Sequence, residues 1–270
     1  MLTKRIYLYD DDQEVYLDVY VAEPTRNFTR KAMLVIPGGG YNRFSSEREG
    51  EPIAMAFIAQ GYNAFVLRYT IERKRVFPAQ LIEASMAMKH IKDHAEEYNI
   101  NPDKVFTVGF SAGGHLAGCL GVMWNKKEIY EAIDMPYGYN KPAGMMLIYP
   151  AVTGVAEYGH MPSFCNLLGT DTPDRQQLTE CSLEQNVTKD AAPLFLMHTS
   201  NDKLADVRNS LCLAEKYREH ELTFEMHIYP DGPHGVALGN EITSFGMERW
   251  IQPQIAKWVD AAVAWAEGIK

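Results

Sequence analysis

Short apolar runs alternate with amphipathic segments along most of the chain. The runs that are apolar nearly throughout occupy residues 31–36, 63–69, 105–110, 145–150 and 193–199. Such runs are typical of strands buried on both faces of a parallel sheet. The polar and apolar alternation at residues 4–9 and 14–21 instead predicts an antiparallel hairpin that turns at the acidic residues 10–12.

Helical periodicity fills the intervals between these runs. Residues 78–98 place apolar side chains at spacings of three and four, which predicts one long amphipathic helix. Further helices are predicted at residues 47–60, with Pro52 in the first turn, near 206–219, and at about 250–267, with a strand at 222–229. The alternation predicts a single α/β domain over residues 1–270, with a mostly parallel sheet covered on both faces.

Residues 151–192 interrupt this rhythm with glycines, prolines and scattered aromatic residues. Because the segment follows a predicted strand, we expect it to form a small insertion over a site at the carboxyl ends of the strands. Ligands of open parallel sheets bind at that edge. The loops after the other predicted strands are therefore the places to look for chemistry.

The run at 105–110 leads into Gly109-Phe110-Ser111-Ala112-Gly113 and then into a helix rich in small residues. Strand, sharp turn and helix around a G-x-S-x-G sequence predict a nucleophile elbow. A side chain two positions before or after the serine would collide with the neighbouring strand and helix, which explains the glycines. Ser111 is the candidate nucleophile.

A serine hydroxyl needs a base, and the base needs an orienting acid. In the chain order Ser, acid, His, the loop after the strand at 193–199 offers Asp202, and the loop before the last helix offers His234. Asp206 is expected to cap the next helix and Asp231 to shape a turn. The remaining histidines have other expected roles: core positions for His198 and His227, solvent for His220, and packing or a supporting role for His115.

The strand at 31–36 runs into Pro37-Gly38-Gly39-Gly40-Tyr41. Three consecutive glycines indicate that the backbone itself approaches a ligand. A phosphate loop would require a following G-K-[ST] or a G-x-G-x-x-G helix start, and neither is present. We therefore expect an oxyanion hole built from the backbone N–H groups of Gly39 or Gly40 and of Ala112.

Composition narrows the classes of function. The 270 residues are 46% hydrophobic and carry a net charge of −9, without the basic field of a nucleic-acid binder. The N-terminal residues lack a signal-peptide core and no apolar run reaches membrane-spanning length, which together with four widely spaced cysteines favours a cytoplasmic protein with reduced thiols. His90 and His94 lack a third ligand and are expected on the surface. No metal, cofactor, membrane or nucleic-acid partner is expected.

Taken together, these motifs resemble the α/β-hydrolase superfamily, and within it the bacterial acetyl-xylan-esterase-like and feruloyl-esterase-like carbohydrate esterases. The resemblance spans about residues 30–240 and rests on the words at 35–41, 61–69, 109–117, 198–202, 207–211 and 229–235. It implies the α/β-hydrolase fold, supports Asp202 as the acid, and implies removal of short acyl groups, often acetyl, from sugars such as xylo-oligosaccharides. Asn201 and Asp206 depart from the acidic residue and the proline that the family commonly has there.

The sequence offers candidate substrate contacts and more than one class of function. Tyr41, His115 and His160 are the candidate substrate contacts, and a small acylated sugar is the expected partner, with a homo-oligomer possible. An amide or lactone hydrolase of the arylformamidase kind would use the same three residues. A catalytically inactive binding module on the same fold is a third hypothesis, disfavoured because all three residues and both oxyanion elements are present.

Overall fold

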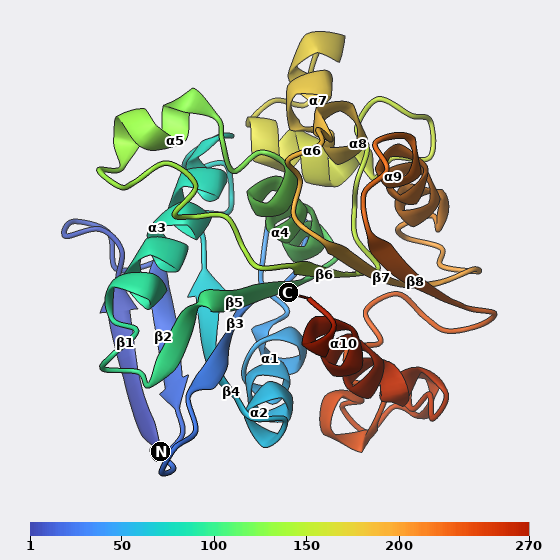
Figure 1. The fold of residues 1–270 in the computed structure, drawn as a ribbon. Helices are drawn as coiled ribbons and strands as arrows, with labels where there is room; N and C mark the ends of the chain where they lie inside the picture. The colour runs from blue at the N-terminus through green and yellow to red at the C-terminus, as the bar shows by residue number, and fades with distance from the viewer. Residues whose placement is uncertain (270) are drawn as a thin grey trace.

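In the computed structural model, which describes residues 1–269, eight strands form one sheet (Figure 1). Their order across the sheet is β1-β2-β4-β3-β5-β6-β7-β8. The strands are β1 (Leu2–Tyr7), β2 (Tyr16–Val21), β3 (Arg30–Ile36), β4 (Tyr62–Arg68), β5 (Ile100–Phe110), β6 (Met145–Ile148), β7 (Leu194–Thr199) and β8 (Phe224–Tyr229). β1 and β2 pair antiparallel and β2 joins β4 antiparallel, whereas β4, β3, β5, β6, β7 and β8 run parallel. The predicted hairpin and mostly parallel sheet are confirmed.

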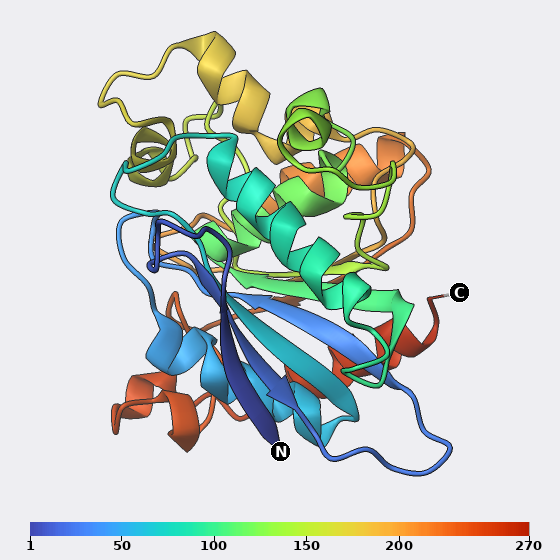
Figure 2. The same cartoon turned by 90° about the vertical axis from the view of Figure 1, so that its left-hand side faces the viewer.

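Helices cover both faces of the sheet, as Figure 2 shows with the sheet between them. α3 (Ala79–Asp93), α4 (Ala112–Val122) and α9 (Arg208–Glu219) pack their apolar side chains into the core on one face. α2 (Glu51–Ala59) and α10 (Trp258–Glu267) enclose a second core on the other face, where Phe57 and Trp258 are fully buried. Burial on both faces explains why the central strands are apolar throughout rather than alternating.

Three helices differ from their predicted bounds. The helix predicted at 78–98 ends at Asp93 and is followed by turns. The segment predicted as one helix at 47–60 is split at Gly50 into α1 (Ser46–Glu49) and α2. The last helix, predicted from about residue 250, begins only at Trp258 and follows the 3₁₀ turns η2 (Glu248–Trp250) and η3 (Ile255–Lys257). Pro253 lies between these turns and has no backbone N–H to donate, so the apolar periodicity of this stretch does not become one continuous helix.

The insertion at 151–192 carries α6 (Met161–Leu168), α7 (Arg175–Cys181) and α8 (Leu183–Asn186). α8 packs against α4 and α9, which places the insertion on the α4 side of the sheet (Figure 1). The remaining short elements are α5 (Lys127–Ala132) and the 3₁₀ turn η1 (Glu241–Thr243). No helix within residues 1–269 is long and apolar enough to cross a bilayer.

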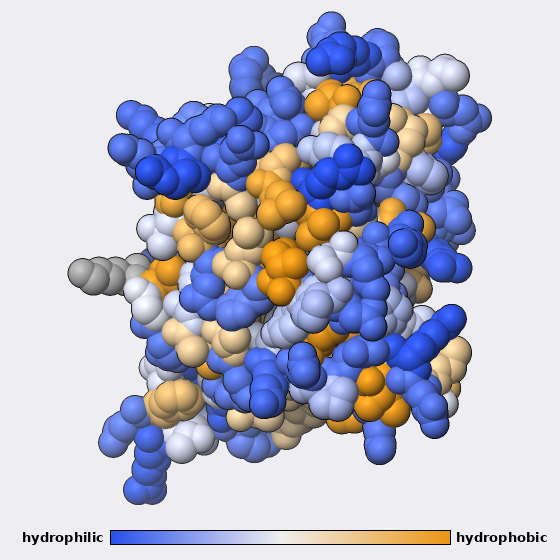
Figure 3. Space-filling view, turned by 90° about the vertical axis from the view of Figure 1, so that its right-hand side faces the viewer, coloured by the Kyte–Doolittle hydropathy of each residue, from blue (hydrophilic) through white to orange (hydrophobic). Residues whose placement is uncertain are grey.

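β8 is an edge strand of the sheet. Ile228 on β8 and Leu211 on α9 are among the exposed large hydrophobic side chains. On the face drawn in Figure 3, apolar residues gather near the middle and polar residues surround them. The homo-oligomer expected from the sequence stays a prediction.

Candidate active site

Ser111 lies at the tip of the turn between β5 and α4, with φ 53° and ψ −117°. This conformation is sparsely populated by residues with a side chain and marks a strained turn. A Cβ on Gly109 would overlap the carbonyl oxygen of Gly113, and a Cβ on Gly113 would overlap the carbonyl oxygens of Ile36 and Pro37. The structure therefore confirms the steric reason for both glycines, and the turn lifts Ser111 out of the strand.

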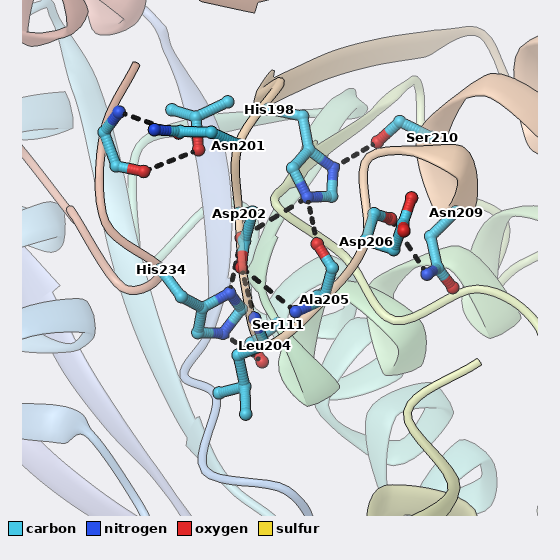
Figure 4. A network of polar contacts seen from close by, with 12 residues as sticks. Ser111, His198, Asn201, Asp202, Leu204, Ala205, Asp206, Asn209, Ser210 and His234 are labelled. Carbon is cyan, nitrogen blue, oxygen red and sulfur yellow. Dashed lines mark hydrogen bonds and ion pairs between the residues drawn. The ribbon is translucent and has the colours of Figure 1, made fainter. Parts of the chain in front are cut away.

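Ser111, His234 and Asp202 form a continuous hydrogen-bond relay (Figure 4). Nε2 of His234 lies 2.9 Å from Oγ of Ser111, and Nδ1 of His234 lies 2.7 Å from Oδ2 of Asp202. The three residues come from the ends of β5 and β7 and from the loop that follows β8, and parallel strands bring these ends to one edge. The predicted residues are thus brought together with the hydrogen bonds that nucleophile, base and acid require.

The Asp202 side chain is fully buried, yet several donors support its ionised form. Its Oδ1 accepts the backbone N–H groups of Leu204 and Ala205 at 2.8 and 3.0 Å. Burial alone would raise the pKa of this carboxyl, but hydrogen bonds from His198, His234 and the Leu204 N–H hold the pKa well below its usual range. Asp202 is therefore a carboxylate that can stabilise an imidazolium at His234.

The glycine loop faces the same space as Ser111. Gly39 and Gly40 adopt φ values of 133° and 68°, which residues with a side chain rarely adopt. The N–H of Gly38 donates to Oε2 of Glu49 at 2.9 Å, so this N–H is already engaged. The carbonyl of Gly40 accepts from Asn166 of α6 at 2.9 Å, which ties the loop to the insertion. Ala112 is the first residue of α4, where backbone N–H groups point away from the helix.

A buried pair that the sequence reasoning missed joins the glycine loop to the His234 loop. The Tyr149 hydroxyl donates to Oε1 of Glu49 at 2.9 Å and accepts from the backbone N–H of Ala237 at 3.0 Å. The Tyr149 ring packs edge-on against His234, with centroids 5.0 Å apart. Burial raises the pKa of Glu49, although the donors from Gly38 and Tyr149 oppose this shift. No local pattern marks this pair, because its members are 100 residues apart.

A cavity of about 590 Å³ opens beside Ser111. His160 of the insertion lines this cavity together with Gly39, Gly40 and His234, as predicted for a substrate contact. Burial and the nearby His234 lower the pKa of His160.

Part of the cavity lining comes from residues not predicted. Arg48, Phe245 and Trp250 line it, and the Arg48 guanidinium stacks 3.7 Å from the centroid of the Trp250 ring. Nε of Arg48 donates to the Thr243 carbonyl at 2.6 Å, whereas its Nη2 is buried without a partner among residues 1–269. No local sequence pattern marks Phe245 or Trp250 as a cavity residue.

Tyr41 and His115 do not face the cavity, which corrects their prediction as substrate contacts. Tyr41 is 2% exposed and His115 is fully buried. The Tyr41 hydroxyl and Nδ1 of His115 are hydrogen-bonded at 2.7 Å, and Nε2 of His115 bonds to the Cys181 carbonyl at 2.7 Å. Burial lowers the pKa of His115 to about 4. With φ 58°, Tyr41 turns its ring inward beneath the glycine loop, and the pair supports the site from below.

The residues weighed as alternatives lie elsewhere. Asp231 bonds to Asn201, and His227 bonds to Glu225 at 2.7 Å. Asp206 accepts the backbone N–H of Arg208 at 2.9 Å, but Val207 rather than Asp206 is the N-cap of α9. His198 is a fully buried, hydrogen-bonded core histidine as expected.

His90 and His94 are half-buried rather than on the open surface, since their rings stack 4.1 Å apart beside Tyr98. Burial, with the neighbouring His94, lowers the pKa of His90 to about 4. Across residues 1–269, no group of three or more His, Cys, Asp or Glu side chains could hold a metal ion.

Known proteins with similar sequences are esterases and a xylanase. The chain is 38% identical over 217 residues to endo-1,4-beta-xylanase B of Butyrivibrio fibrisolvens, covering 78% of this chain and 33% of that protein. It is 26% identical over 258 residues to an acetylxylan esterase of Xylanibacter ruminicola, covering 94% of this chain and 50% of that one. The chain thus spans a third to a half of the length of these relatives.

Solved structures match over nearly their whole length. An acetyl ester-xyloside bifunctional hydrolase from Caldicellulosiruptor lactoaceticus gives a TM-score of 0.83 at 29% identity, covering 98% of this chain and 96% of that one. The α/β hydrolase MGS-M1 from a Medee basin deep-sea metagenome library gives 0.80 at 32% identity, covering 100% and 98%. The BD-FAE family model matches residues 17–217. The fold is that of an α/β hydrolase, the expected resemblance to carbohydrate esterases is confirmed, and the chain belongs to the BD-FAE family.

Proposed function

We propose that this protein is a serine carboxylic-ester hydrolase that removes short acyl groups, above all acetyl, from carbohydrate esters such as acetylated xylo-oligosaccharides. The relay from Ser111 through His234 to Asp202, with distances of 2.9 and 2.7 Å at the mouth of one cavity, carries the proposal. Nucleophile, base and acid with a glycine loop beside them suit acyl transfer.

The reaction follows from this geometry. Nε2 of His234 takes the Ser111 proton while Oγ attacks the ester carbonyl carbon, and Asp202 stabilises the imidazolium that forms. The oxyanion accepts hydrogen bonds from the N–H of Ala112 and from Gly39 or Gly40; Gly38 is excluded because Glu49 holds its N–H. His234 then protonates the departing alcohol. Water, deprotonated by the same imidazole, releases the acid and restores Ser111.

The acyl group and the alcohol follow from different observations. An acetylxylan esterase, an acetyl ester-xyloside hydrolase and a xylanase are among the relatives, which supports an acetylated sugar as substrate. The cavity of about 590 Å³ is within the range of small-molecule sites. Its Trp250 wall offers an aromatic face, and His160 offers a hydrogen-bonding group on the insertion side.

A substrate panel tests the proposal. Acetyl, butyryl and feruloyl aryl esters, acetylated xylo-oligosaccharides, a formyl-anilide and a lactone are offered to the wild type and to Ser111→Ala. We expect kcat/KM to be highest for the acetyl esters and to fall on the order of 1000-fold or more in Ser111→Ala. Preferential turnover of the anilide or the lactone would replace the esterase assignment with the amide or lactone hydrolase. Unchanged acetyl-ester turnover in the variant would refute the role of Ser111.

A further inference from the structure

A second histidine contacts the acid of the relay. His198 lies on β7, four residues before Asp202, and neither side chain is exposed. Its Nε2 lies 3.4 Å from Oδ2 of Asp202, the same oxygen that binds Nδ1 of His234 (Figure 4). Asp202 is therefore held between two imidazoles, only one of which reaches Ser111.

The hydrogen bonds around His198 close the acid loop on itself. Nε2 of His198 lies 2.8 Å from the carbonyl oxygen of Ala205, and the N–H of Ala205 donates to Oδ1 of Asp202 at 3.0 Å. On its other side, Nδ1 of His198 lies 2.7 Å from Oγ of Ser210 on α9. The imidazole thus links β7, the acid loop and α9 through three partners.

These partners fix where the proton of His198 lies. A carbonyl oxygen only accepts, so Nε2 must carry the hydrogen that points to Ala205 and, more weakly, to Asp202. The Ser210 hydroxyl can donate to Nδ1, which then needs no second proton. These contacts require a proton on Nε2, and they accommodate a neutral imidazole whose Nδ1 accepts from Ser210.

We propose that His198 is a positioning residue for the relay: as a neutral imidazole it fixes the loop of Asp202 and shares the charge of that carboxylate with His234. This inference rests on the proposed function. The shared oxygen is the central observation, because each donor to Oδ2 lessens the negative charge available to the other. His198 therefore limits how strongly Asp202 favours protonation of His234.

Other ionisable groups near the relay do not take this place. Asp206 follows the acid loop and pairs with Arg208. His160 and Glu49 line the cavity with His234, and both oxygens of Glu49 are engaged by Gly38 and Tyr149. The exposed side chain of Lys203 extends from the acid loop to solvent.

The pH profile of kcat/KM on an aryl acetate tests the charge-sharing part. In His198→Leu, Asp202 loses one donor and favours imidazolium at His234 more strongly. We expect the acid limb to move to higher pH by about half a unit, as a single neutral hydrogen bond allows. His198→Gln can place an amide N–H where Nε2–H was, and should restore the wild-type limb. His227→Leu, on the adjacent strand β8, is the matched control and should leave the limb in place.

A purely structural role gives a different result. It would lower kcat in His198→Leu without moving the acid limb, and this outcome would overturn the proposal. A limb displaced equally in His198→Gln and in His198→Leu would overturn it too, because the Nε2–H donor would then be irrelevant.

A measurement on the wild type needs neither a variant nor turnover. With ¹⁵N-labelled histidine, the ring nitrogen shifts of His198 should report the neutral tautomer protonated on Nε2 at the pH of the activity assay. An imidazolium, or the tautomer protonated on Nδ1, would refute the proposal. Absence of ester hydrolysis would refute the proposed function but leave this reading of His198 intact, so the two failures are distinguishable.

Discussion

The substitution Tyr149→Phe tests the hydrogen-bonded link between the glycine loop and the His234 loop. In Tyr149→Phe the ring stays, so the edge-on contact with His234 is kept and only the hydroxyl is lost. Two hydrogen bonds disappear: the one donated to Glu49 at 2.9 Å and the one accepted from the Ala237 N–H at 3.0 Å. Both partners are buried, since Glu49 is 3% exposed and Ala237 is not exposed.

The size of the effect follows from these two bonds. Leaving the Ala237 N–H unpaired and removing a donor from Glu49 should together lower the free energy of unfolding by about 3 kcal/mol. In a chain of this size that corresponds to a fall in Tm of roughly 6–12 °C. Because the N–H of Gly38 and the loop of His234 are then less firmly held, we also expect kcat/KM for an aryl acetate to fall about tenfold.

Tyr62→Phe is the matched control for thermal unfolding and urea denaturation. Tyr62 is as deeply buried as Tyr149, but its hydroxyl has no hydrogen-bond partner among the described residues. Removing an unsatisfied hydroxyl should leave the stability unchanged or raise it by about 1 kcal/mol. If Tyr149→Phe unfolds within 1 °C of the wild type, or if both variants lose stability equally, the reasoning from the two hydrogen bonds is refuted.

Three further substitutions test the elbow, the cavity lining and the acid of the relay. Gly113→Ala places a Cβ onto the carbonyl oxygens of Ile36 and Pro37 and should lower the free energy of unfolding by more than about 3 kcal/mol in thermal unfolding. Gly268→Ala, at the end of α10, is the control and should leave this free energy unchanged. A Gly113→Ala variant as stable as the wild type would contradict the steric explanation of the elbow. Trp250→Ala removes the aromatic ring that stacks on Arg48 in the cavity lining. In steady-state assays it should raise KM for acetylated xylo-oligosaccharides about fivefold with little change in kcat. A loss confined to kcat would show that the Trp250 ring does not bind the substrate. Asp202→Asn should lower kcat/KM on the order of 1000-fold or more. Because the folded-state pKa of Asp202 is lowered, the ionised carboxyl stabilises the fold above the usual carboxyl pKa, and this contribution is lost as the pH falls below it. In urea unfolding, Asp202→Asn should therefore lose more free energy of unfolding relative to the wild type at pH 7 than at pH 3. An equal loss at both pH values would contradict a lowered pKa.

The three relay residues that the sequence identified share one property: each lies in a loop after a predicted strand of the parallel sheet. Ser111, Asp202 and His234 follow β5, β7 and β8, and parallel strands necessarily bring these loops to one edge. Local pattern and chain order were therefore enough to predict which side chains meet, and the hydrogen bonds of 2.9 and 2.7 Å are consistent with this.

What the sequence left open depends on contacts between distant segments. Tyr149 and Glu49 are 100 residues apart, and Arg48 and Thr243 are 195 apart, with no pattern to pair either couple. Tyr41 follows the glycines, but its positive φ turns the ring into the core, a direction that residue type does not indicate. Only the packed chain shows that Phe245 and Trp250, rather than Tyr41, line the cavity with aromatic rings.

Covalent labelling shows directly whether Ser111 is the nucleophile of an esterase. The wild type and Ser111→Ala are treated with a fluorophosphonate, and the modified peptide is located by mass spectrometry. We predict stoichiometric labelling of the wild type at Ser111 with parallel loss of acetate release from acetylated xylo-oligosaccharides, and no labelling of the variant. Labelling at another serine, or a variant that still reacts and still releases acetate, would contradict the account.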